Sequence, residues 1–348
     1  MTNLLTIGLP VFNAMPFLEE SMESLLGQTD RDFAILAIDD GSIDSSLGYL
    51  RSIRDPRLTV VTQAHRGLTF TLNRMLCEVT TPWLMRHDAD DVALPERVAI
   101  TKKAIRQFPD AGMFYSEARY YQNGRSIGTF RTTRATPDQL RQITSRGYLP
   151  AICHPTVTLN VEKATALGGY RFDLHIEDID LWWRMALCHD IRYLPEITIY
   201  FRHNTASVST ANLECQSINT LYVQYLLLSH LHDLPALSYE DVRDHLARDV
   251  DKPRLLCREE MRRANIFYSQ NYYWKGCRHL AKAVRAHPLY FIGRVLYELR
   301  RSEAVFNGED PQKFLEQCDV LWPETGDSTA RVNSTIAISS NTKRVECA

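Results

Sequence analysis

The chain has 348 residues, of which 45% are hydrophobic and 24% are charged, and this mixture is typical of folded globular proteins rather than disordered or fibrous ones. Its 40 basic and 42 acidic side chains give a formal net charge of -2, so the chain lacks the positive field that holds nucleic acid without sequence preference. Because a single domain usually contains about 100 to 200 residues, we expect one large domain with an appendage.

The first hundred residues alternate short apolar runs with amphipathic helical patterns, which is typical of parallel strands joined by crossover helices. The runs are apolar throughout, as in strands that are covered on both faces. The first helix is marked by Pro16 near its start, by Glu19 and Glu20 in its first turn and by Gly27 just past its end. Strands are expected at residues 4–9, 33–38, 58–62 and 83–86.

The second hundred residues predict a change from a parallel to a mixed sheet. Asn123-Gly124 lies between short β-prone runs and indicates a hairpin turn. The apolar spacing predicts helices from Pro95 to about residue 108 and over 178–188, with further strands at 113–116 and 156–160. The fold class is therefore α/β, a mixed sheet flanked by helices.

From residue 214 onward the pattern is almost wholly helical, so we expect a sheet-containing domain over 1–212 and a helical C-terminal region over 213–322. Within that region, residues 264–287 predict a helical hairpin. After Pro323 the composition turns to Ser, Thr, Asn and Gly, which predicts a disordered tail over 323–348.

The cysteine pattern and the lack of targeting signals indicate a cytoplasmic protein. The eight cysteines contain no C-x-x-C pair, so we expect reduced thiols rather than a zinc ribbon or a disulfide scaffold. Residues 1–9 do not resemble a signal peptide, and the most apolar later stretch, 221–234, is interrupted by polar residues, so no bilayer-spanning segment is expected. Residues 289–301 combine apolar and arginine side chains; they either contact the inner face of a membrane or dock on the chain's own domain.

Polar residues follow three of the predicted strands. The first strand ends in Pro10-Val11-Phe12-Asn13, the second in Asp39-Asp40-Gly41-Ser42 and the fourth in Asp88-Ala89-Asp90-Asp91. In open α/β sheets ligands bind beyond the carboxyl ends of the strands, where loops converge. Because clustered carboxylates repel one another and are hard oxygen ligands, we expect a divalent cation, Mn²⁺ or Mg²⁺, among them.

Five motifs in chain order resemble those of family 2 glycosyltransferases of the GT-A (Rossmann-like) fold: P-V-F-N, D-F-A-I-L-A-I-D-D-G-S-I-D, H-D-A-D-D, G-G-Y and E-D-I-D-L-W-W-R. The resemblance covers roughly residues 4 to 210. It implies a nucleotide-sugar donor, a divalent metal and transfer of the sugar with inversion at its anomeric carbon.

By this resemblance Pro10, Val11 and Asn13 line the nucleotide pocket, largely through their backbone, and Asp40 accepts a hydrogen bond from the base. Such a bond to a charged acceptor is roughly twice as strong as one to a neutral acceptor. The alternative is turn chemistry, because Asp-Asp-Gly-Ser begins many loops. Arg66 matches a second nucleotide contact, on base or phosphate, and its alternative is a solvated surface arginine.

The resemblance makes Asp88 and Asp90 the D-x-D element, with Asp88 reaching ribose or metal and Asp90 binding the metal directly. When bound, the metal neutralises the diphosphate as it leaves. The alternative is an ordinary acidic loop at the end of a strand. His203 falls where related enzymes place a residue close to the diphosphate, as a metal ligand, or Arg202 holds phosphate instead.

Glu177 and Asp178 begin a predicted helix, where backbone N–H groups and the helix dipole favour the ionised carboxylate. In the family's E-D motif the aspartate is the general base, so the resemblance assigns this role to Asp178, with Glu177 as its neighbour and Asp180 as a structural or acceptor contact. The alternative role of Asp178 is helix capping. The Trp182-Trp183 pair is expected in the core.

The function expected from these residues is an inverting, non-processive glycosyltransferase that moves a hexosyl or N-acetylhexosaminyl group, from a UDP-sugar, to a glycan or lipid-linked glycan. The chain lacks the Q-x-x-R-W element of the polymerising members. The alternatives are a metal-dependent phosphohydrolase and a catalytically silent sugar-binding module. A dinucleotide oxidoreductase is disfavoured because no G-x-G-x-x-G follows the first strand. The sequence leaves the oligomeric state open.

Overall fold

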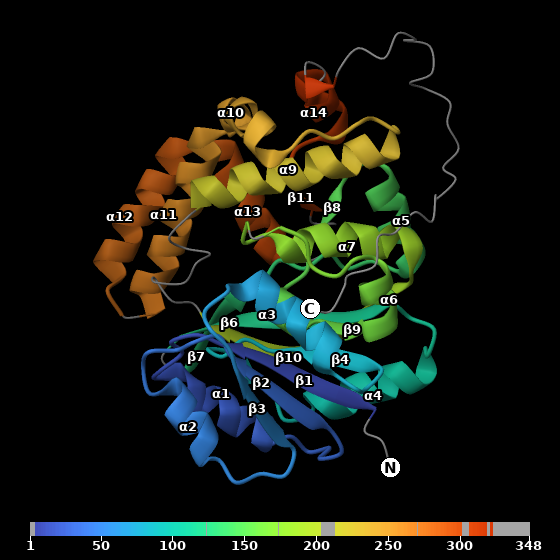
Figure 1. Ribbon diagram of the computed structural model, residues 1–348. Helices are drawn as coiled ribbons and strands as arrows, with labels where there is room; N and C mark the ends of the chain where they lie inside the picture. The colour runs from blue at the N-terminus through green and yellow to red at the C-terminus, as the bar shows by residue number, and fades with distance from the viewer. Residues whose placement is uncertain are drawn as a thin grey trace.

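The structure is a computed structural model that describes residues 4–122, 124–172, 174–202, 213–269, 271–300, 306–318 and 321–322. In this part of the chain the central element is a nine-stranded mixed sheet (Figure 1). Eight of its strands follow the order β3-β2-β1-β4-β9-β6-β10-β5, and the ninth, β7, pairs with β6. The strands are β1 Leu5–Val11, β2 Ala34–Asp39, β3 Leu58–Thr62, β4 Trp83–Arg86, β5 Val92–Ala93, β6 Met113–Gln122, β7 Arg125–Thr129, β9 Thr158–Asn160 and β10 Ile191–Arg202.

Helices cover both faces of this sheet. Alternate residues of β2 point to opposite faces: Ile35 belongs to one buried apolar cluster and Leu36 to the other. Gly8 of β1 allows close packing, because a Cβ atom there would lie 2.8 Å from Leu84 and 3.0 Å from Met75. The helices of this region are α1 Phe17–Leu26, α2 Ser46–Ser52, α3 Leu68–Glu78, α4 Arg97–Gln107, α5 Pro137–Ser145, α6 Val161–Ala166 and α7 Glu177–Cys188.

The four strands expected in the first hundred residues are present to within two residues at each end. Strand β10, by contrast, was not predicted, although it pairs with β6 along most of its twelve residues. Pro195 interrupts its apolar pattern, and the register shifts between Leu194 and Ile197. Proline is tolerated inside sheets at such irregularities, so β10 continues through a residue that usually argues against a strand.

The C-terminal region is helical, as expected, but it shares a core with the sheet region. Val223 and Leu227 of α9 pack with Leu149, Ile176 and Trp183 in one buried cluster. A two-stranded sheet, β8 Leu149–Pro150 with β11 Phe306–Asn307, also joins the two parts. The helices are α9 Leu213–Leu231, α10 Tyr239–Asp249, α11 Lys252–Ser269, α12 Tyr273–Ala286, α13 Pro288–Arg300 and α14 Pro311–Cys318.

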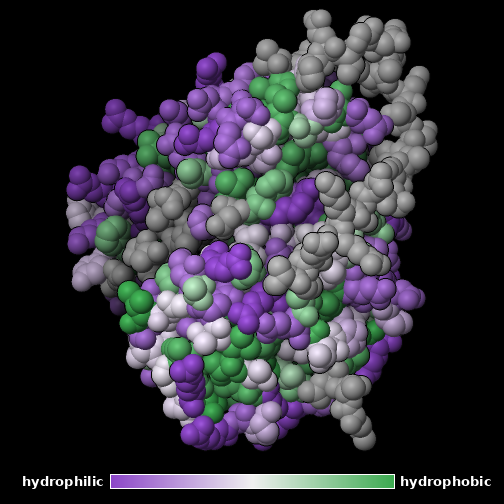
Figure 2. Space-filling model, viewed as in Figure 1, coloured by the Kyte–Doolittle hydropathy of each residue, from purple (hydrophilic) through white to green (hydrophobic). Residues whose placement is uncertain are grey.

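The surface of this region is mixed. Figure 2 shows mainly hydrophilic residues over α11 and α12, at the left edge of the view. No helix within the described ranges has the length and apolar character needed to cross a membrane.

The cysteines do not all have the expected state. Free thiols are present at Cys153, Cys188, Cys215, Cys257 and Cys277. Cys77 is disulfide-bonded, so the expectation that every thiol is reduced is not met.

Candidate active site

The polar strand ends meet at one edge of the sheet because β1, β2 and β3 are parallel and in register. Val11 lies opposite Asp39, and Asp39 lies opposite Thr62. The ladder continues into the loops: the Asp40 N–H donates to the Val11 carbonyl at 2.8 Å. Strand β4 lies on the other side of β1, and the His87 N–H donates to the Gly8 carbonyl at 3.1 Å. The segments predicted to bind a ligand therefore begin at a common edge.

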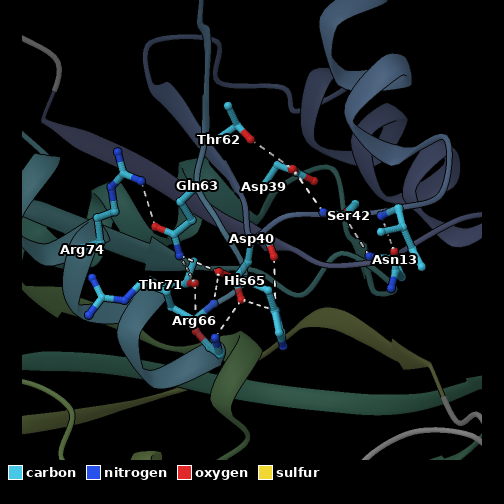
Figure 3. Close-up of polar contacts among 12 residues, drawn as sticks. Asn13, Asp39, Asp40, Ser42, Thr62, Gln63, His65, Arg66, Thr71 and Arg74 are labelled. Carbon is cyan, nitrogen blue, oxygen red and sulfur yellow. Dashed lines mark hydrogen bonds and ion pairs between the residues drawn. The ribbon is translucent and has the colours of Figure 1, made fainter.

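Asn13 holds the loop after β1 against the loop after β2. Its backbone N–H donates to Ser42 Oγ at 2.9 Å, and its Oδ1 accepts from the Ile43 N–H at 2.9 Å (Figure 3). The backbone of Asn13 is left-handed, with φ of 49°, which asparagine tolerates better than most residues. Val11 is 1% exposed, so its side chain belongs to the core. Contact of Pro10, Val11 and Asn13 with a nucleotide stays a prediction.

Asp40 is buried and organises the loop after β3 (Figure 3). Its Oδ1 accepts from Gln63 Nε2 at 2.6 Å and from the Arg66 N–H at 2.9 Å. Its Oδ2 accepts from the Gly67 N–H at 2.9 Å and lies 2.9 Å from Nδ1 of His65. Two oxygens of a carboxylate offer about four acceptor positions, so internal donors fill all of them.

Asp39, unlike Asp40, forms hydrogen bonds within the turn after its own strand and with the end of β3. Its Oδ2 accepts from the Ser42 N–H and from Thr62 Oγ1, both at 3.3 Å. These are the contacts of a carboxylate that shapes the turn after its own strand. The turn interpretation therefore applies to Asp39, which is 1% exposed.

Arg66 contributes its backbone to the Asp40 loop, and its side chain lies at the surface. The guanidinium carbon is 3.4 Å from the centroid of the Phe70 ring, a cation–π contact. The predicted contact of Arg66 with base or phosphate is not tested by this geometry and stays a prediction.

At the end of β4, the D-x-D element lies beside a buried arginine. Arg86 is 2% exposed; its Nη2 lies 2.5 Å from Asp88 Oδ1, and its Nη1 donates to the His87 carbonyl. Burial and, to a smaller extent, the like charge of Asp88 raise the pKa of Asp90 to about 6. An added cation would relieve this repulsion.

Arg202, considered as a phosphate ligand, is held by neighbouring residues. Its Nε donates to the Asp90 carbonyl at 2.7 Å, and its guanidinium pairs with Glu20. Its backbone N–H donates to Asp91 Oδ1 at 2.8 Å, which also fixes the buried Asp91. His203, the predicted third metal ligand, lies outside the described residues.

Glu177 and Asp178 form the first turn of α7. Asp178 Oδ1 accepts from the Ile179 N–H at 2.8 Å, yet burial raises the pKa of Asp178 to about 6. The helix N-terminus was expected to favour the charged form; burial outweighs it. Burial also raises the pKa of Glu177 to about 8, and the charge of Asp178 contributes to this shift.

Electrostatic effects show that the two motifs share one region. After burial, which is the main cause, the charge of Asp88 raises the pKa values of both Glu177 and Asp178, and Arg86 lowers both. We call Asp88, Asp90, Glu177 and Asp178 the acidic cluster. Residues that are about ninety positions apart in the chain are thereby gathered around one buried guanidinium.

Other polar residues of the E-D-I-D-L-W-W-R motif serve the fold. Asp180 is fully buried and pairs with Arg171 and Arg184, both at 2.6 Å. Trp182 and Trp183 are buried, as expected for core residues. The motif therefore divides into a candidate site half, Glu177 and Asp178, and a structural half that includes Asp180, Trp182 and Trp183.

Two further residues near the cluster were missed or given little weight by sequence reasoning. His154 Nε2 lies 3.2 Å from the Tyr170 hydroxyl and its Nδ1 lies 3.9 Å from Glu177 Oε1. Burial lowers the pKa of His154 well below its usual value, so the ring is neutral. Arg86 carried a signal, a lone arginine ahead of H-D-A-D-D, but its contact with Asp88 appears only in the folded chain.

The carboxylate oxygens of Asp88 and Asp90 fit a divalent cation that binds together with phosphate. Within the described part of the chain, no group of three or more His, Cys, Asp or Glu side chains is arranged to hold a metal ion. Mg²⁺, however, is usually bound by one or two carboxylates plus substrate phosphates and waters. Asp88 and Asp90 would supply the two carboxylates. Burial is the main cause of the raised pKa of Asp90, and the like charge of Asp88, which a cation would offset, adds to it.

Known proteins with similar sequences include several named as glycosyltransferases. Residues 6–165 match the family described as glycosyl transferase family 2. The uncharacterized glycosyltransferase YibD of Escherichia coli K12 is 32% identical over 256 residues, which cover 69% of this chain and 73% of YibD. The O-antigen biosynthesis glycosyltransferase WbnJ of Escherichia coli is 24% identical over 237 residues, or 62% of this chain and 87% of WbnJ.

Solved structures share the fold at lower identity. TarS of S. aureus (residues 1-349), in complex with UDP-GlcNAc, has a TM-score of 0.52 and 14% identity, with 88% of this chain and 99% of that chain covered. The mannosyltransferase PcManGT from Pyrobaculum calidifontis, in complex with GDP-Man and Mn²⁺, has a TM-score of 0.50 and 18% identity, with 91% and 86% covered. The sheet and its flanking helices are those of the GT-A fold. The chain belongs to glycosyltransferase family 2 and is a glycosyltransferase enzyme.

Proposed function

We propose that this enzyme transfers one sugar per encounter, with inversion, from a nucleoside diphosphate donor to a hydroxyl of a glycan or lipid-linked glycan. The observation that carries the proposal is the acidic cluster, in which the charge of Asp88 adds to burial in raising the pKa values of both Glu177 and Asp178. Family membership favours sugar transfer over the phosphohydrolase and over a silent sugar-binding module.

Asp178 is the proposed general base. In a single displacement the acceptor oxygen attacks the anomeric carbon, its proton passes to the Asp178 carboxylate, and the bond from that carbon to the diphosphate oxygen breaks. Asp178 is partly exposed, so an acceptor hydroxyl can reach it. With a pKa of about 6, its carboxylate is ionised at neutral pH and still basic enough to take a proton.

Glu177 has a supporting role. It is 4% exposed and its pKa is raised to about 8, so it is largely protonated at neutral pH. A neutral Glu177 does not compete with Asp178 for the proton and adds no further negative charge to the cluster. Glu177 therefore keeps Asp178 as the single ionised carboxylate of the pair.

Asp88 and Asp90 hold the donor side of the site. A divalent cation, Mn²⁺ or Mg²⁺, bound to these two carboxylates would neutralise the charge that develops on the leaving diphosphate. Arg86 fixes the position of Asp88 through their ion pair. PcManGT, with which this chain shares its fold, was solved with GDP-Man and Mn²⁺. His203 is retained as a proposed additional ligand.

The nucleotide is proposed to lie along the edge formed by Pro10, Val11, Asn13 and Asp40, with Arg66 beside it. TarS, whose fold is similar, was solved with UDP-GlcNAc, which supports a UDP-sugar carrying a hexosyl or N-acetylhexosaminyl group. Because WbnJ acts in O-antigen biosynthesis, we propose a polysaccharide or lipid-linked precursor as acceptor.

The helical C-terminal region, 213–322, is proposed to serve the acceptor, while 1–212 carries the donor site. Helix α13 exposes Leu289, Ile292 and Leu296, with 77%, 51% and 40% of each residue accessible. Such a stripe beside arginine side chains is typical of helices that lie on a membrane surface. We therefore place the enzyme in the cytoplasm, peripheral to the inner face of the membrane through residues 289–301.

A thermal-shift screen tests the donor proposal. The full chain is heated with UDP-, GDP- and dTDP-sugars, each with and without Mn²⁺, because a ligand that binds only the folded state raises the melting temperature. We expect the largest rise with a UDP-sugar plus Mn²⁺, and no Mn²⁺-dependent rise in Asp90→Ala. A UDP-sugar response that is equal in wild type and variant, or unaffected by chelator, would contradict the metal role.

A further inference from the structure

The side chain of His65 makes two contacts that together resemble those of a bound nucleobase. Its ring stacks on Phe12, with ring centroids 3.9 Å apart and the planes inclined by 18°. Its Nδ1 lies 2.9 Å from Asp40 Oδ2 and 3.2 Å from the Asp40 carbonyl oxygen (Figure 3). Both oxygens are acceptors only, so Nδ1 carries the proton and donates it toward Asp40.

We propose that the His65 imidazole occupies the nucleobase subsite of the donor-free enzyme and is displaced when the base binds. A flat ring against Phe12 with a ring N–H directed at Asp40 is the arrangement that a base would need at this edge. The inference rests on the proposed function, in which Asp40 receives the base. His65 is thus an internal competitor of the donor.

Displacement is feasible because the rest of the Asp40 network does not depend on His65. Asp40 keeps the backbone N–H groups of Arg66 and Gly67 and the side chain of Gln63. Gln63 is itself braced: its Oε1 accepts from Arg74 at 2.8 Å, and its Nε2 donates to Thr71 at 2.9 Å (Figure 3). Loss of the imidazole therefore vacates one acceptor position on Oδ2 and leaves the carboxylate in place.

The imidazole is also accessible to solvent. The His65 side chain is 55% exposed although its ring stacks on Phe12. The backbone of His65 is close-packed, because a Cβ atom on Gly41 would lie only 2.8 Å from the His65 nitrogen. Rotation of the side chain about its own bonds, with the backbone held, clears the subsite.

The contact of His65 with Asp40 restricts which nucleobases can take its place. A ring that replaces His65 must donate a ring N–H to Asp40, since that oxygen accepts and does not donate. Uracil, thymine and guanine have such a ring N–H, whereas adenine and cytosine in their usual tautomers do not. Donors carrying the first three bases fit the subsite, and ADP- and CDP-linked donors do not.

Calorimetric titration of the full chain with UDP, GDP, ADP and CDP in the presence of Mn²⁺ tests the proposal. Because binding no longer breaks the imidazole contacts, His65→Ala should bind UDP about three- to tenfold more tightly than wild type. His65→Phe keeps a ring on Phe12 but no N–H, and should gain less. Phe12→Ala removes the stacking surface for the base. This variant should bind UDP at least about threefold more weakly than wild type. His232→Ala, at an exposed histidine after α9, is the matched control and should be unchanged.

Chemical modification of the wild-type protein provides a second test of whether UDP displaces His65. Diethyl pyrocarbonate labels accessible imidazoles, and mass spectrometry quantifies the label on His65. We expect saturating UDP to raise the labelling rate at His65, because the ring leaves Asp40 and enters solvent. A lower rate would show that the base stacks on the open face of His65 instead, and would overturn the proposal.

The binding measurements distinguish a failure of the His65 proposal from a failure of the proposed function. Equal or weaker UDP binding by His65→Ala, with binding by the wild type intact, overturns the role of His65 and leaves the proposed function standing. If neither wild type nor His65→Ala binds UDP or GDP, both the donor proposal and the His65 proposal are wrong. Tight binding of ADP would contradict the base class alone.

Discussion

The loop network around Asp40 and the acidic cluster both place carboxylates at the carboxyl edge of the sheet, but their charge is compensated differently. Asp40 receives hydrogen bonds from donors on four neighbouring residues of a single loop, 63–67. In the acidic cluster, burial and like charge raise the pKa values of Asp90, Glu177 and Asp178. The buried Arg86 opposes all three shifts, and Arg202 also opposes that of Asp90.

In the proposed function, this difference separates donor recognition by Asp40 from the chemistry of the acidic cluster. A saturated carboxylate presents a fixed surface, and a ligand binds it only by displacing an internal donor. A crowded, incompletely compensated cluster gains from an added cation or a proton, so it is suited to proton transfer and to metal binding. The predictions below test this contrast, beginning with the largest effect.

Asp178→Asn removes the proposed base and keeps the shape of the side chain. The transfer rate should fall about 10²- to 10⁴-fold, the usual contribution of a positioned base, while UDP affinity stays unchanged. Initial rates and calorimetry measure the two quantities. Asp138→Asn, at an aspartate whose side chain is 96% exposed, is the matched control. An unchanged transfer rate in Asp178→Asn would remove this residue from the mechanism.

Asp180→Ala tests the structural half of the same motif. The substitution leaves Arg171 and Arg184 without their shared partner, and breaking a buried ion pair costs roughly 3–5 kcal/mol of unfolding free energy. Urea denaturation should show this loss, whereas Asp178→Asn should show little. Wild-type stability in Asp180→Ala would mean that the two aspartates do not differ as the structure implies.

Asp90→Ala tests the metal side of the acidic cluster. UDP affinity measured with Mn²⁺ should weaken by at least about tenfold, equivalent to about 1.4 kcal/mol, because one of the two ligands is lost. Affinity measured with excess chelator provides the control and should be the same in wild type and variant. Unchanged Mn²⁺-dependent binding would place the metal elsewhere.

The pH dependence of transfer should report the raised pKa of Asp178. The base acts only when ionised, so kcat/KM should fall as pH drops through about 6, about tenfold per unit below that value. A pH–rate profile at fixed metal concentration measures it, with melting temperatures recorded at each pH to exclude unfolding. A profile that is flat between pH 5 and 7 would contradict the assignment.

Glu177 should produce the smallest effect, on stability. Its pKa is higher in the folded state than in the unfolded state, so the folded chain binds more protons and stability is lost as pH rises from about 5 to about 8. In metal-free buffer, Glu177→Gln should lose less stability than wild type over that range. Parallel curves for the two proteins would show that Glu177 is not protonated at neutral pH.

Much of the fold was predictable from local pattern. Strands β1, β2 and β4 are mainly apolar and mainly buried, as expected for strands covered on both faces, whereas β3, at the edge of the sheet, contains Thr59 and Thr62 and is partly exposed. Strand β10 was missed because Pro195 breaks its pattern, and only pairing with β6 compensates for it. The shared core of α9 with β8 and α7 could not be inferred from a boundary in composition at residue 213.

The candidate site was predictable as a set of residues and not as a set of contacts. The spacing of Asp88 and Asp90, and the position of Glu177 and Asp178 at a helix start, are readable along the chain. The pairing of Arg86 with Asp88 and the stacking of His65 on Phe12 join side chains whose partners are set by how strands and loops meet.

The amino-acid sequence alone determined most of the element types, the edge of the sheet at which polar residues gather and the family that the motifs resemble, because each depends on short-range spacing. Tertiary structure alone decided the surroundings of each carboxylate. Asp178 and Asp180 are chemically identical and two residues apart, yet one is partly exposed with a raised pKa and the other is locked between two arginines. Burial and through-space partners make that difference, and neither is a property of local sequence.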